Sequence, residues 1–440
     1  MKVLKFGGTS VGSAQRMKDV AKLITDGEQK IVVLSAMSGT TNTLVEISDY
    51  LYKKNPEGAN EIINTLENKY KQHIEELYST EEYKQKTLEF VKSVFDYIRS
   101  YTKDIFTLFE EKVILAQGEI ISTNMVTNYL CEQGVNAVLL PALEYMRTDK
   151  NSEPDTMYIR EKLRIQLANN PGAEIYITQG YICRNAYGEI DNLQRGGSDY
   201  TASLVGAAVD ASEIQIWTDI DGMHDNDPRF VDNTSPVRHL QFEEAAELAY
   251  FGAKILHPTC VQPAKYANIP VRLLNTMEPT APGTLISNES EKGKIKAVAA
   301  KDNITAIKIK SSRMLLAHGF LRKVFEIFES YQTSIDMICT SEVGVSMSID
   351  NTKHLNEILD DLKKYGTVTV DHDMCIVCVV GDLDWENVGF EAKALDAMRE
   401  IPVRMISFGG SNYNISFLIR ESDKKRALQA LSNALFNNKD

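Results

Sequence analysis

The sequence has no long apolar run and no excess of positive charge. No hydrophobic run approaches the ~20 residues that a membrane-spanning helix needs, and the N-terminus leads into a short apolar stretch without a signal-peptide pattern. The 440 residues carry a formal net charge of −13, which argues against a nucleic acid or an anionic membrane surface as a partner. We therefore expect a cytoplasmic protein that binds neither.

Cysteine is also scarce. Six cysteines are scattered through the chain, which suits a reducing compartment better than a disulfide framework. Cys375 and Cys378 have the spacing of a metal or redox motif, but they lie in an apolar, β-branched run that predicts a buried strand. An i, i+3 pair on a strand points to opposite faces. We therefore interpret both residues as buried thiols.

A glycine-rich loop stands near the start of the chain. Residues 5–12 read KFGGTSVG and lie between a predicted strand, Lys2–Phe6, and a segment with helical spacing of its apolar residues. The loop lacks both the P-loop ending Gly-Lys-Ser/Thr and the dinucleotide pattern Gly-x-Gly-x-x-Gly. Glycines and hydroxyls at a helix start still favour an anion, because free backbone N–H groups and the helix dipole point at it. The alternative is a plain tight turn.

Strand and helix patterns alternate through the first 275 residues. This alternation predicts an α/β fold with a three-layer, mainly parallel sheet, interrupted by a charged helical excursion at about residues 44–113. Ligands of such sheets bind at the carboxyl ends of the strands. We therefore expect the glycine-rich loops to surround a ligand site.

The pattern changes after residue 275. Residues 276–294 are rich in proline, glycine and charge, which is typical of a linker. Beyond them, two weakly similar units predict a duplicated α+β, ferredoxin-like domain. The second unit lacks a fourth strand, and residues 295–300 could supply it. The expected division is therefore residues 1–280 (catalytic domain), 281–294 (linker), 303–372 (first small unit), and 295–302 with 373–440 (second small unit), the first unit being inserted in the second.

Charged residues at the predicted strand ends suggest phosphoryl transfer. Lys5 and Lys254 can supply positive charge, while Asp199 and Asp219 can orient lysines or bind Mg²⁺ through water. Each has an ordinary alternative: Asp219 could cap a turn, and Lys254 could lie on the surface. Their joint occurrence on strand-end loops favours a phosphate site.

Two further residues suit an amino acid as the acceptor. Arg195 offers a bidentate fork for a carboxylate, and Glu119 offers a counter-ion for an ammonium, although it could instead stabilise a helix dipole. The combination favours a small zwitterionic acid beside a nucleotide.

Several segments, in order, resemble the signatures of the aspartokinases, the members of the amino-acid kinase family that phosphorylate the side-chain carboxylate of aspartate. They are residues 5–12 (KFGGTSVG), 117–119 (QGE), 195–202 (RGGSDYTA), 217–219 (WTD), 227–229 (DPR) and 252–258 (GAKILHP). Residues 319–321 (GFL) and 340–343 (TSEV) resemble the paired ACT domains of the same enzymes. The resemblance covers essentially the whole chain.

The resemblance implies a role for each site residue. It assigns catalysis to Lys5, Asp199 and Lys254. It assigns nucleotide binding to Lys5, Gly7, Gly8, Thr218, Asp219, His224, Arg229, Lys254 and Ile255. It assigns aspartate binding to Thr41, Glu119, Arg195, Gly196, Gly197, Ser198 and Asp199. Two positions depart from the usual pattern, since Gln194 replaces a glycine and His224 replaces a tyrosine that often flanks the nucleotide.

The resemblance also implies ligands and regulation. It implies ATP, Mg²⁺ held through the nucleotide phosphates, L-aspartate as acceptor, feedback inhibition by lysine, and a homodimer or homotetramer formed through the ACT domains. The residues implied at the lysine site are Met314, His318, Phe320, Leu321, Ser334, Asp336, Thr340 and Ser341. We expect Asp336 to bind the terminal ammonium of lysine, unless it merely ends a strand. A kinase for a glutamate-type acceptor and a non-catalytic amino-acid sensor remain as alternatives.

Overall fold

The computed structural model describes residues 1–103, 105–193, 196–252, 257–314 and 318–436. The chain divides into two compact bodies. The N-terminal body comprises residues 1–223 and 256–288, and the C-terminal body comprises residues 224–255 and 289–440. Within the described ranges, no helix is both long and apolar enough to cross a membrane.

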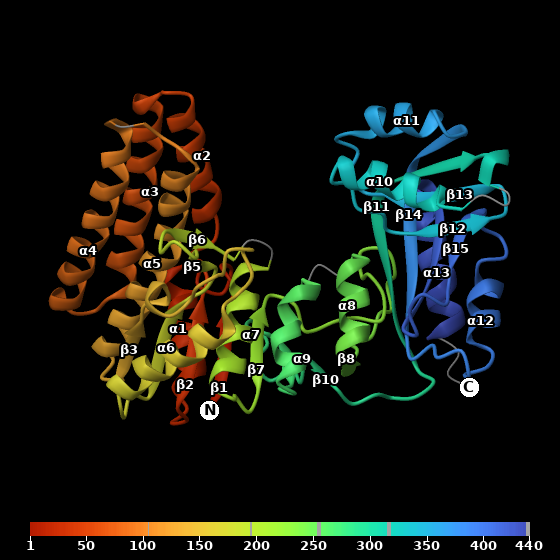
Figure 1. Ribbon diagram of the computed structural model, residues 1–440. Helices are drawn as coiled ribbons and strands as arrows, with labels where there is room; N and C mark the ends of the chain where they lie inside the picture. The colour runs from red at the N-terminus through yellow and green to blue at the C-terminus, as the bar shows by residue number, and fades with distance from the viewer. Residues whose placement is uncertain (104, 194–195, 253–256, 315–317, 437–440) are drawn as a thin grey trace. The chain divides into compact units, whose positions relative to one another are not determined.

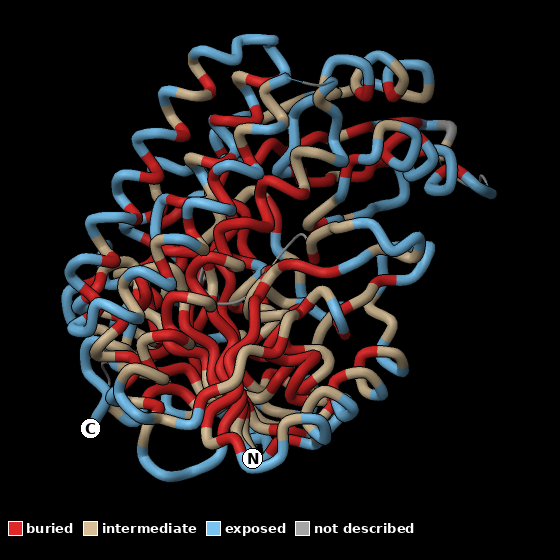
Figure 2. The backbone as a smooth tube through the Cα atoms, turned by 90° about the vertical axis from the view of Figure 1, so that its left-hand side faces the viewer, coloured by how far each residue is buried: buried red, intermediate tan, exposed pale blue. Residues whose placement is uncertain are grey.

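A mainly parallel sheet forms the centre of the N-terminal body (Figure 1). Its strands lie in the order β3 (Ala137–Leu140), β4 (Ile175–Gln179), β2 (Lys30–Leu34), β1 (Lys2–Phe6), β7 (Ile214–Thr218), β9 (Val271–Asn275) and β10 (Thr284–Ser287). Strand β10 runs antiparallel to β9, whereas the others pair in parallel. Strands β2 and β4 are buried along their whole length. Figure 2 shows the buried segments, in red, gathered near the marked N-terminus. The predicted α/β sheet is confirmed.

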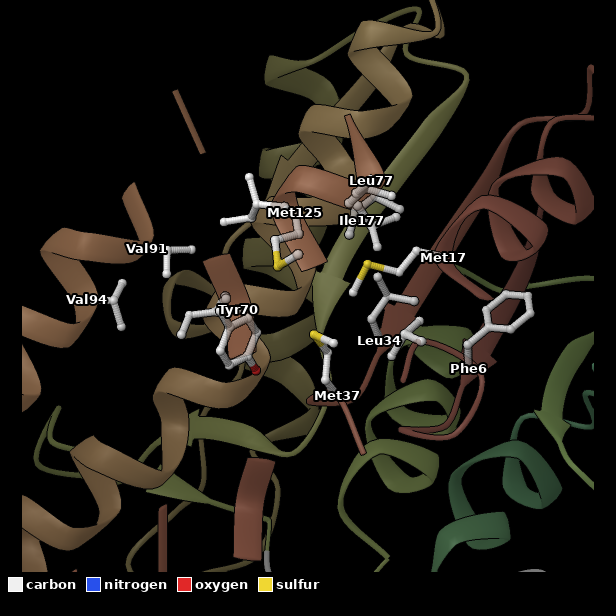
Figure 3. Close-up of a cluster of buried hydrophobic side chains, with 14 of the residues drawn as sticks. Phe6, Met17, Leu34, Met37, Tyr70, Leu77, Val91, Val94, Met125 and Ile177 are labelled. Atoms are coloured by element: carbon white, nitrogen blue, oxygen red, sulfur yellow. The ribbon is translucent and has the colours of Figure 1, made fainter. Parts of the chain in front are cut away.

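Helices cover this sheet and extend beyond it. The predicted helical excursion forms three of them, α2 (Thr40–Tyr52), α3 (Pro56–Leu77) and α4 (Glu81–Ser100). Their apolar faces join the sheet in one buried cluster, in which Tyr70 of α3 packs near Met37 and Leu34 (Figure 3). The remaining regular elements of this body are α1 (Ala14–Ile24), α5 (Leu108–Glu132), α6 (Thr156–Asn169), α7 (Gly197–Ala208), α9 (Gln262–Tyr266) and the hairpin β5 (Ile182–Arg184) with β6 (Ile190–Asn192).

The segment predicted as a linker contains a strand, which corrects the prediction. Strand β10 lies inside it and pairs with β9, with Thr284 opposite Leu273. Gly283 makes this pairing possible, because it adopts φ +64° and a Cβ there would lie 1.8 Å from the carbonyl oxygen of Leu273. The Pro282-Gly283 pair therefore starts a strand rather than a flexible connection.

An antiparallel sheet forms the centre of the C-terminal body. Its strands lie in the order β12 (Ile338–Ser341), β13 (Gly344–Ile349), β11 (Ile295–Lys310), β14 (Thr367–Gly381), β16 (Asn414–Arg420) and β15 (Val403–Ser407). Helices α10 (Phe320–Ser330), α11 (Leu355–Lys363), α12 (Phe390–Ala397) and α13 (Lys424–Leu435) pack on it. Strand β8 (His239–Gln241) and helix α8 (Phe242–Tyr250) also belong to this body.

Two long strands run through both small units. The last residues of β11, from Thr305, pair with β13, while its first residues, from Ile295, pair with the end of β14. The sequence suggests separate strands at 367–370 and 375–380, but the structure joins them in β14. The sequence also predicts a strand at residues 333–339, which is wrong in part because β12 begins only at Ile338. Before it, the backbone groups of Asp336 and Met337 hydrogen-bond to Ser348.

The loop after β7 folds on the second small unit. The Asn226 side chain is buried and its Nδ2 donates to the carbonyl of Leu428 in α13 at 3.0 Å. Val231 lies in the apolar core that contains Phe417 of β16, and the amide of Val298 in β11 donates to the carbonyl of Asp225 at 2.8 Å. Residues 224–238 thus depend on partners that follow them by 60 residues or more.

A fragment ending at Asn288 should therefore lose order in residues 224–238, because it lacks those partners. We expect trypsin to cut after Arg229 and Arg238 faster in this fragment than in the full chain, as followed by mass spectrometry. Cleavage after Arg184, in the β5–β6 hairpin of the N-terminal body, serves as the internal control. Equal rates at Arg229 in both proteins would contradict this account of the loop.

Candidate functional site

The ion pair between Lys5 and Asp199 joins two elements of the N-terminal body. Lys5 is the next-to-last residue of β1, and Asp199 lies in the first turn of α7. The Lys5 Nζ atom is 2.7 Å from Asp199 Oδ1, and the two side chains are only 11% and 17% exposed. A pair with so little water around it interacts strongly. The structure therefore brings two of the predicted catalytic residues together.

The loops after β1 and β2 form one floor beside this pair. A Cβ at Gly8 would lie 2.8 Å from the carbonyl oxygen of Ala36, so only glycine allows the approach. The amide of Ser38 donates to the carbonyl of Gly8 at 3.1 Å. Gly7 lies close to Lys5, since a Cβ at Gly7 would be 3.4 Å from Lys5 Nζ. Gly7 thus places no side chain beside the Lys5 ammonium, and Gly8 lets the two loops approach each other.

The start of α7 is fixed by close packing. Gly196 caps the helix with φ +77°, and a Cβ there would overlap Cys260 Sγ at 1.9 Å. A Cβ at Gly197 would lie 2.7 Å from the ring of Tyr181. Ser198 accepts a hydrogen bond from the hydroxyl of Ser35 at 2.8 Å. The predicted residues 196–199 are therefore held against the end of β2.

Glu119 is a buried carboxyl beside the same floor. It lies in α5, where Gly118 allows close contact because a Cβ there would be 2.8 Å from Ala36 Cβ. Its Oε1 accepts from the amide of Ala36 at 3.2 Å, while Oε2 is buried without a hydrogen-bond partner among the described residues. Burial raises the pKa of Glu119 to about 8. An arriving cation would satisfy Oε2 and favour the ionised form.

Thr218 and Asp219, at the end of β7, line a small cavity of about 30 Å³ with Ser10, Arg16 and Thr276. Thr276 donates its hydroxyl to the carbonyl of Thr218 at 2.9 Å and shares a 2.8 Å hydrogen bond with Ser10. Arg16 donates to the carbonyl of Thr9. No sequence motif marks Arg16 or Thr276 as site residues, because each is a lone polar residue on a helix or after a strand.

The remaining residues predicted for the substrate and catalytic site lie in α2 or outside the described residues. Thr41 is the second residue of α2 and is half-buried. Arg195, Lys254 and Ile255, with the departure at Gln194, lie outside the described residues.

His224 and Arg229 belong to the C-terminal body. Arg229 is 71% exposed and its guanidinium pairs with Asp227 at 2.6 Å. His224 Nδ1 hydrogen-bonds with Thr234 Oγ1 at 2.9 Å. The paired carboxylate holds the Arg229 fork at the surface, where an anion can reach it.

The residues predicted for the lysine site all lie in the first small unit. Phe320 begins α10 and is buried, Met314 packs on the core of this unit, and Thr340 with Ser341 lie on the exposed strand β12. His318, Leu321 and Ser334 are exposed. Asp336 differs from them, because its side chain is only 1% exposed and Lys301 Nζ lies 2.8 Å from its Oδ1.

The raised pKa of Glu119 predicts a pH dependence of stability. Between pH 4.5 and about 8, the folded carboxyl keeps a proton that the unfolded chain releases, so stability falls as pH rises through this window. Glu119→Gln removes the effect, and we expect its Tm relative to wild type to increase from pH 5 to pH 8 in thermal melts. Glu82→Gln, at an exposed position, is the control. A constant difference in Tm would contradict the prediction.

Known proteins resemble this chain over its full length. Residues 1–275 match the amino acid kinase family, and residues 377–435 match an ACT domain. Aspartokinase 1, chloroplastic, from Arabidopsis thaliana is 34% identical over 100% of this chain and 80% of its own length. Lysine-sensitive aspartokinase 3 from Escherichia coli (strain K12) is 32% identical over 99% of each chain.

Solved structures share the fold as well. Escherichia coli aspartokinase III in complex with aspartate and ADP (R-state) superposes with a TM-score of 0.84 at 31% identity, over 99% of this chain and 100% of that chain. The same enzyme in complex with lysine and aspartate (T-state) gives a TM-score of 0.83 at 32% identity, over 99% of each chain. With an amino acid kinase domain and a C-terminal ACT domain in one chain, and relatives that are similar over its full length, the protein belongs to the aspartokinase family.

Proposed function

We propose that the protein transfers the γ-phosphoryl group of ATP to the side-chain carboxylate of L-aspartate. The product is 4-phospho-L-aspartate, and the reaction is the first step of lysine, threonine and methionine biosynthesis. The observation that carries the proposal is the Lys5–Asp199 ion pair beside the glycine floor. The similarity to an aspartokinase solved with aspartate and ADP supports it.

The acceptor needs little activation. An aspartate side chain has a pKa of about 3.9, so it is ionised at neutral pH and requires no general base. The difficulty is to bring two anions together, which calls for fixed positive charge and good positioning. Lys5 would neutralise the transferred phosphoryl group, with Asp199 holding the lysine in place. Lys254 would assist from its own segment.

The amino acid would be held by its two other charges. The unpartnered Oε2 of Glu119 suits the α-ammonium, because a cation there satisfies a buried acceptor. Arg195 is proposed to bind the α-carboxylate, and Thr41 and residues 196–198 to complete the pocket. This arrangement would leave the side-chain carboxylate free to react.

The nucleotide is proposed to contact the loops around Thr218 and Asp219 and the segment around His224, Arg229, Lys254 and Ile255. The described residues contain no group of three or more His, Cys, Asp or Glu side chains that could hold a metal. As the resemblance implies, we infer that Mg²⁺ arrives on the nucleotide phosphates, where it would neutralise phosphate charge, with the exposed Asp219 available to its water shell.

Regulation by lysine is proposed at the first small unit, with the residues at 314–341 named above. The lysine complex of a relative similar over 99% of the chain supports this. ACT-type sites in this family form where two units pack together, so we also propose a homodimer or homotetramer.

The activity predicts an aspartyl hydroxamate product with ATP, Mg²⁺ and L-aspartate. Lys5→Met should lower kcat by about 10²-fold or more with a smaller change in the KM for aspartate, because its charge matters most as the phosphoryl group moves. Lys22→Met, exposed on α1, is the matched control. Reaction with glutamate alone would favour the glutamate-type kinase, and no reaction with either would favour the sensor.

The regulation predicts inhibition by lysine that depends on Asp336. Asp336→Asn should weaken lysine inhibition by at least ~5-fold, since a coupling of ~1–3 kcal/mol is enough to regulate the enzyme. Steady-state assays with lysine and threonine would measure it, with Asp360→Asn on the surface of α11 as control. Inhibition by threonine alone, or unchanged lysine inhibition in Asp336→Asn, would refute the site.

A further inference from the structure

The Asp336 carboxylate already has a cation of its own. Its Oδ1 accepts from the hydroxyl of Tyr250 at 2.6 Å and lies 2.8 Å from Lys301 Nζ. The same ammonium lies 2.9 Å from Asp350 Oδ2. These four residues, the Asp336 cluster, all belong to the C-terminal body.

The cluster joins three separate elements. Tyr250 ends helix α8, Lys301 lies within β11, and Asp350 follows β13. The Lys301 ammonium also stands 4.3 Å from the centre of the Tyr250 ring, a cation–π distance. Burial works to lower the pKa of Lys301, but its hydrogen bonds to Asp336 and Asp350 raise that pKa overall. The internal lysine therefore stays charged.

One carboxylate oxygen of the Asp336 cluster accepts no hydrogen bond from the described residues. Asp336 Oδ2 is buried and has no hydrogen-bond partner among the described residues. A buried carboxylate oxygen without a donor is costly. The position therefore suits a donor that comes from outside the chain, and an ammonium is the donor that a half-neutralised carboxylate would take.

We propose that Lys301 is an internal counter-ion that holds Asp336 until the terminal ammonium of free lysine replaces it, and that Lys301 thereby sets the affinity and selectivity of this effector site. The inference rests on the proposed regulation at Asp336. An ammonium arriving at Oδ2 would stand beside a second cation, and the two would repel each other. Asp350 gives the displaced Lys301 a carboxylate of its own.

Replacement of Lys301 by the effector ammonium would change the contacts of Tyr250 at the end of helix α8. When Lys301 leaves Asp336, the Tyr250 ring loses its cation and the Tyr250 hydroxyl shares its acceptor with the effector instead. Tyr250 stands four residues before Lys254 in the sequence. Asp336 therefore contacts a residue that precedes a proposed catalytic lysine by four positions in the sequence.

Lysine binding to full-length variants tests the proposal, measured by isothermal titration calorimetry without substrates. Lys301→Met removes the competitor and should tighten lysine binding by about 10-fold. Lys301→Arg should weaken it, because a guanidinium can grip the carboxylate with two hydrogen bonds. Lys308→Met, half-buried on the same strand, is the matched control and should leave binding unchanged.

Chemical rescue gives a second readout. Without its internal cation, Asp336 should destabilise Lys301→Met, and saturating lysine should raise the Tm of this variant more than that of wild type. Norleucine, which lacks the terminal ammonium, should rescue neither protein. A purely structural lysine would give a Tm loss that free lysine does not repair.

The outcomes separate this inference from the proposed function. Equal or weaker lysine binding by Lys301→Met overturns the inference alone. Binding by Lys301→Met but not by wild type supports it while removing lysine as the regulator of the natural protein. No binding by either protein overturns both. If Lys301→Met does not fold, lysine binding by Lys301→Arg as tight as wild type overturns the inference.

Discussion

The Lys5–Asp199 ion pair ties the central strand β1 to the first turn of α7 across a distance of 2.7 Å. The backbone at both ends of this ion pair is packed so closely that two neighbouring glycines cannot be replaced by larger residues. Gly8 leaves no room for a side chain against Ala36, and Gly196 leaves none against Cys260. The charges can stay paired with little water only because the backbone packs this closely. The order of the strands, with β1 between β2 and β7, is what brings these loops to one edge.

Two buried carboxyls in this chain illustrate opposite solutions to the same problem. Among the described residues, no cation pairs with Glu119. Burial therefore raises the pKa of Glu119 to about 8, and its Oε2 atom accepts no hydrogen bond from them. Asp336 is equally hidden, but Lys301 and Tyr250 already share one of its oxygens. A carboxyl of the first kind gains its charge together with its ligand, whereas one of the second kind is charged beforehand and must exchange one cation for another. The first suits the proposed substrate contact at Glu119, and the second suits the proposed effector contact at Asp336.

Local patterns were enough to predict most elements, because their evidence lies within a few residues. A short apolar run predicts a strand at Val271–Asn275 and an amphipathic period predicts a helix at Phe242–Tyr250, and the structure has both with these bounds. Strand β10 was missed because Pro282 and Gly283 resemble a linker until β9 lies beside them. The partners of Asp336 were missed for the same reason: Lys301 and Tyr250 are 35 and 86 residues away in the sequence, and no motif connects them. Within the described residues, Lys5 and Asp199 come together where the glycine-rich segments predict neighbouring loops.

The pairing of β11 with β14 has a consequence for the history of the chain. Ile304 lies opposite Met374, so the backbone departs for the first small unit and returns from it at neighbouring points of one ladder. A stretch that leaves and re-enters at a single place can be deleted, copied or replaced by recombination while the surrounding strands keep their register. The first small unit could therefore be exchanged as one piece without any change in the sheet that holds Lys5.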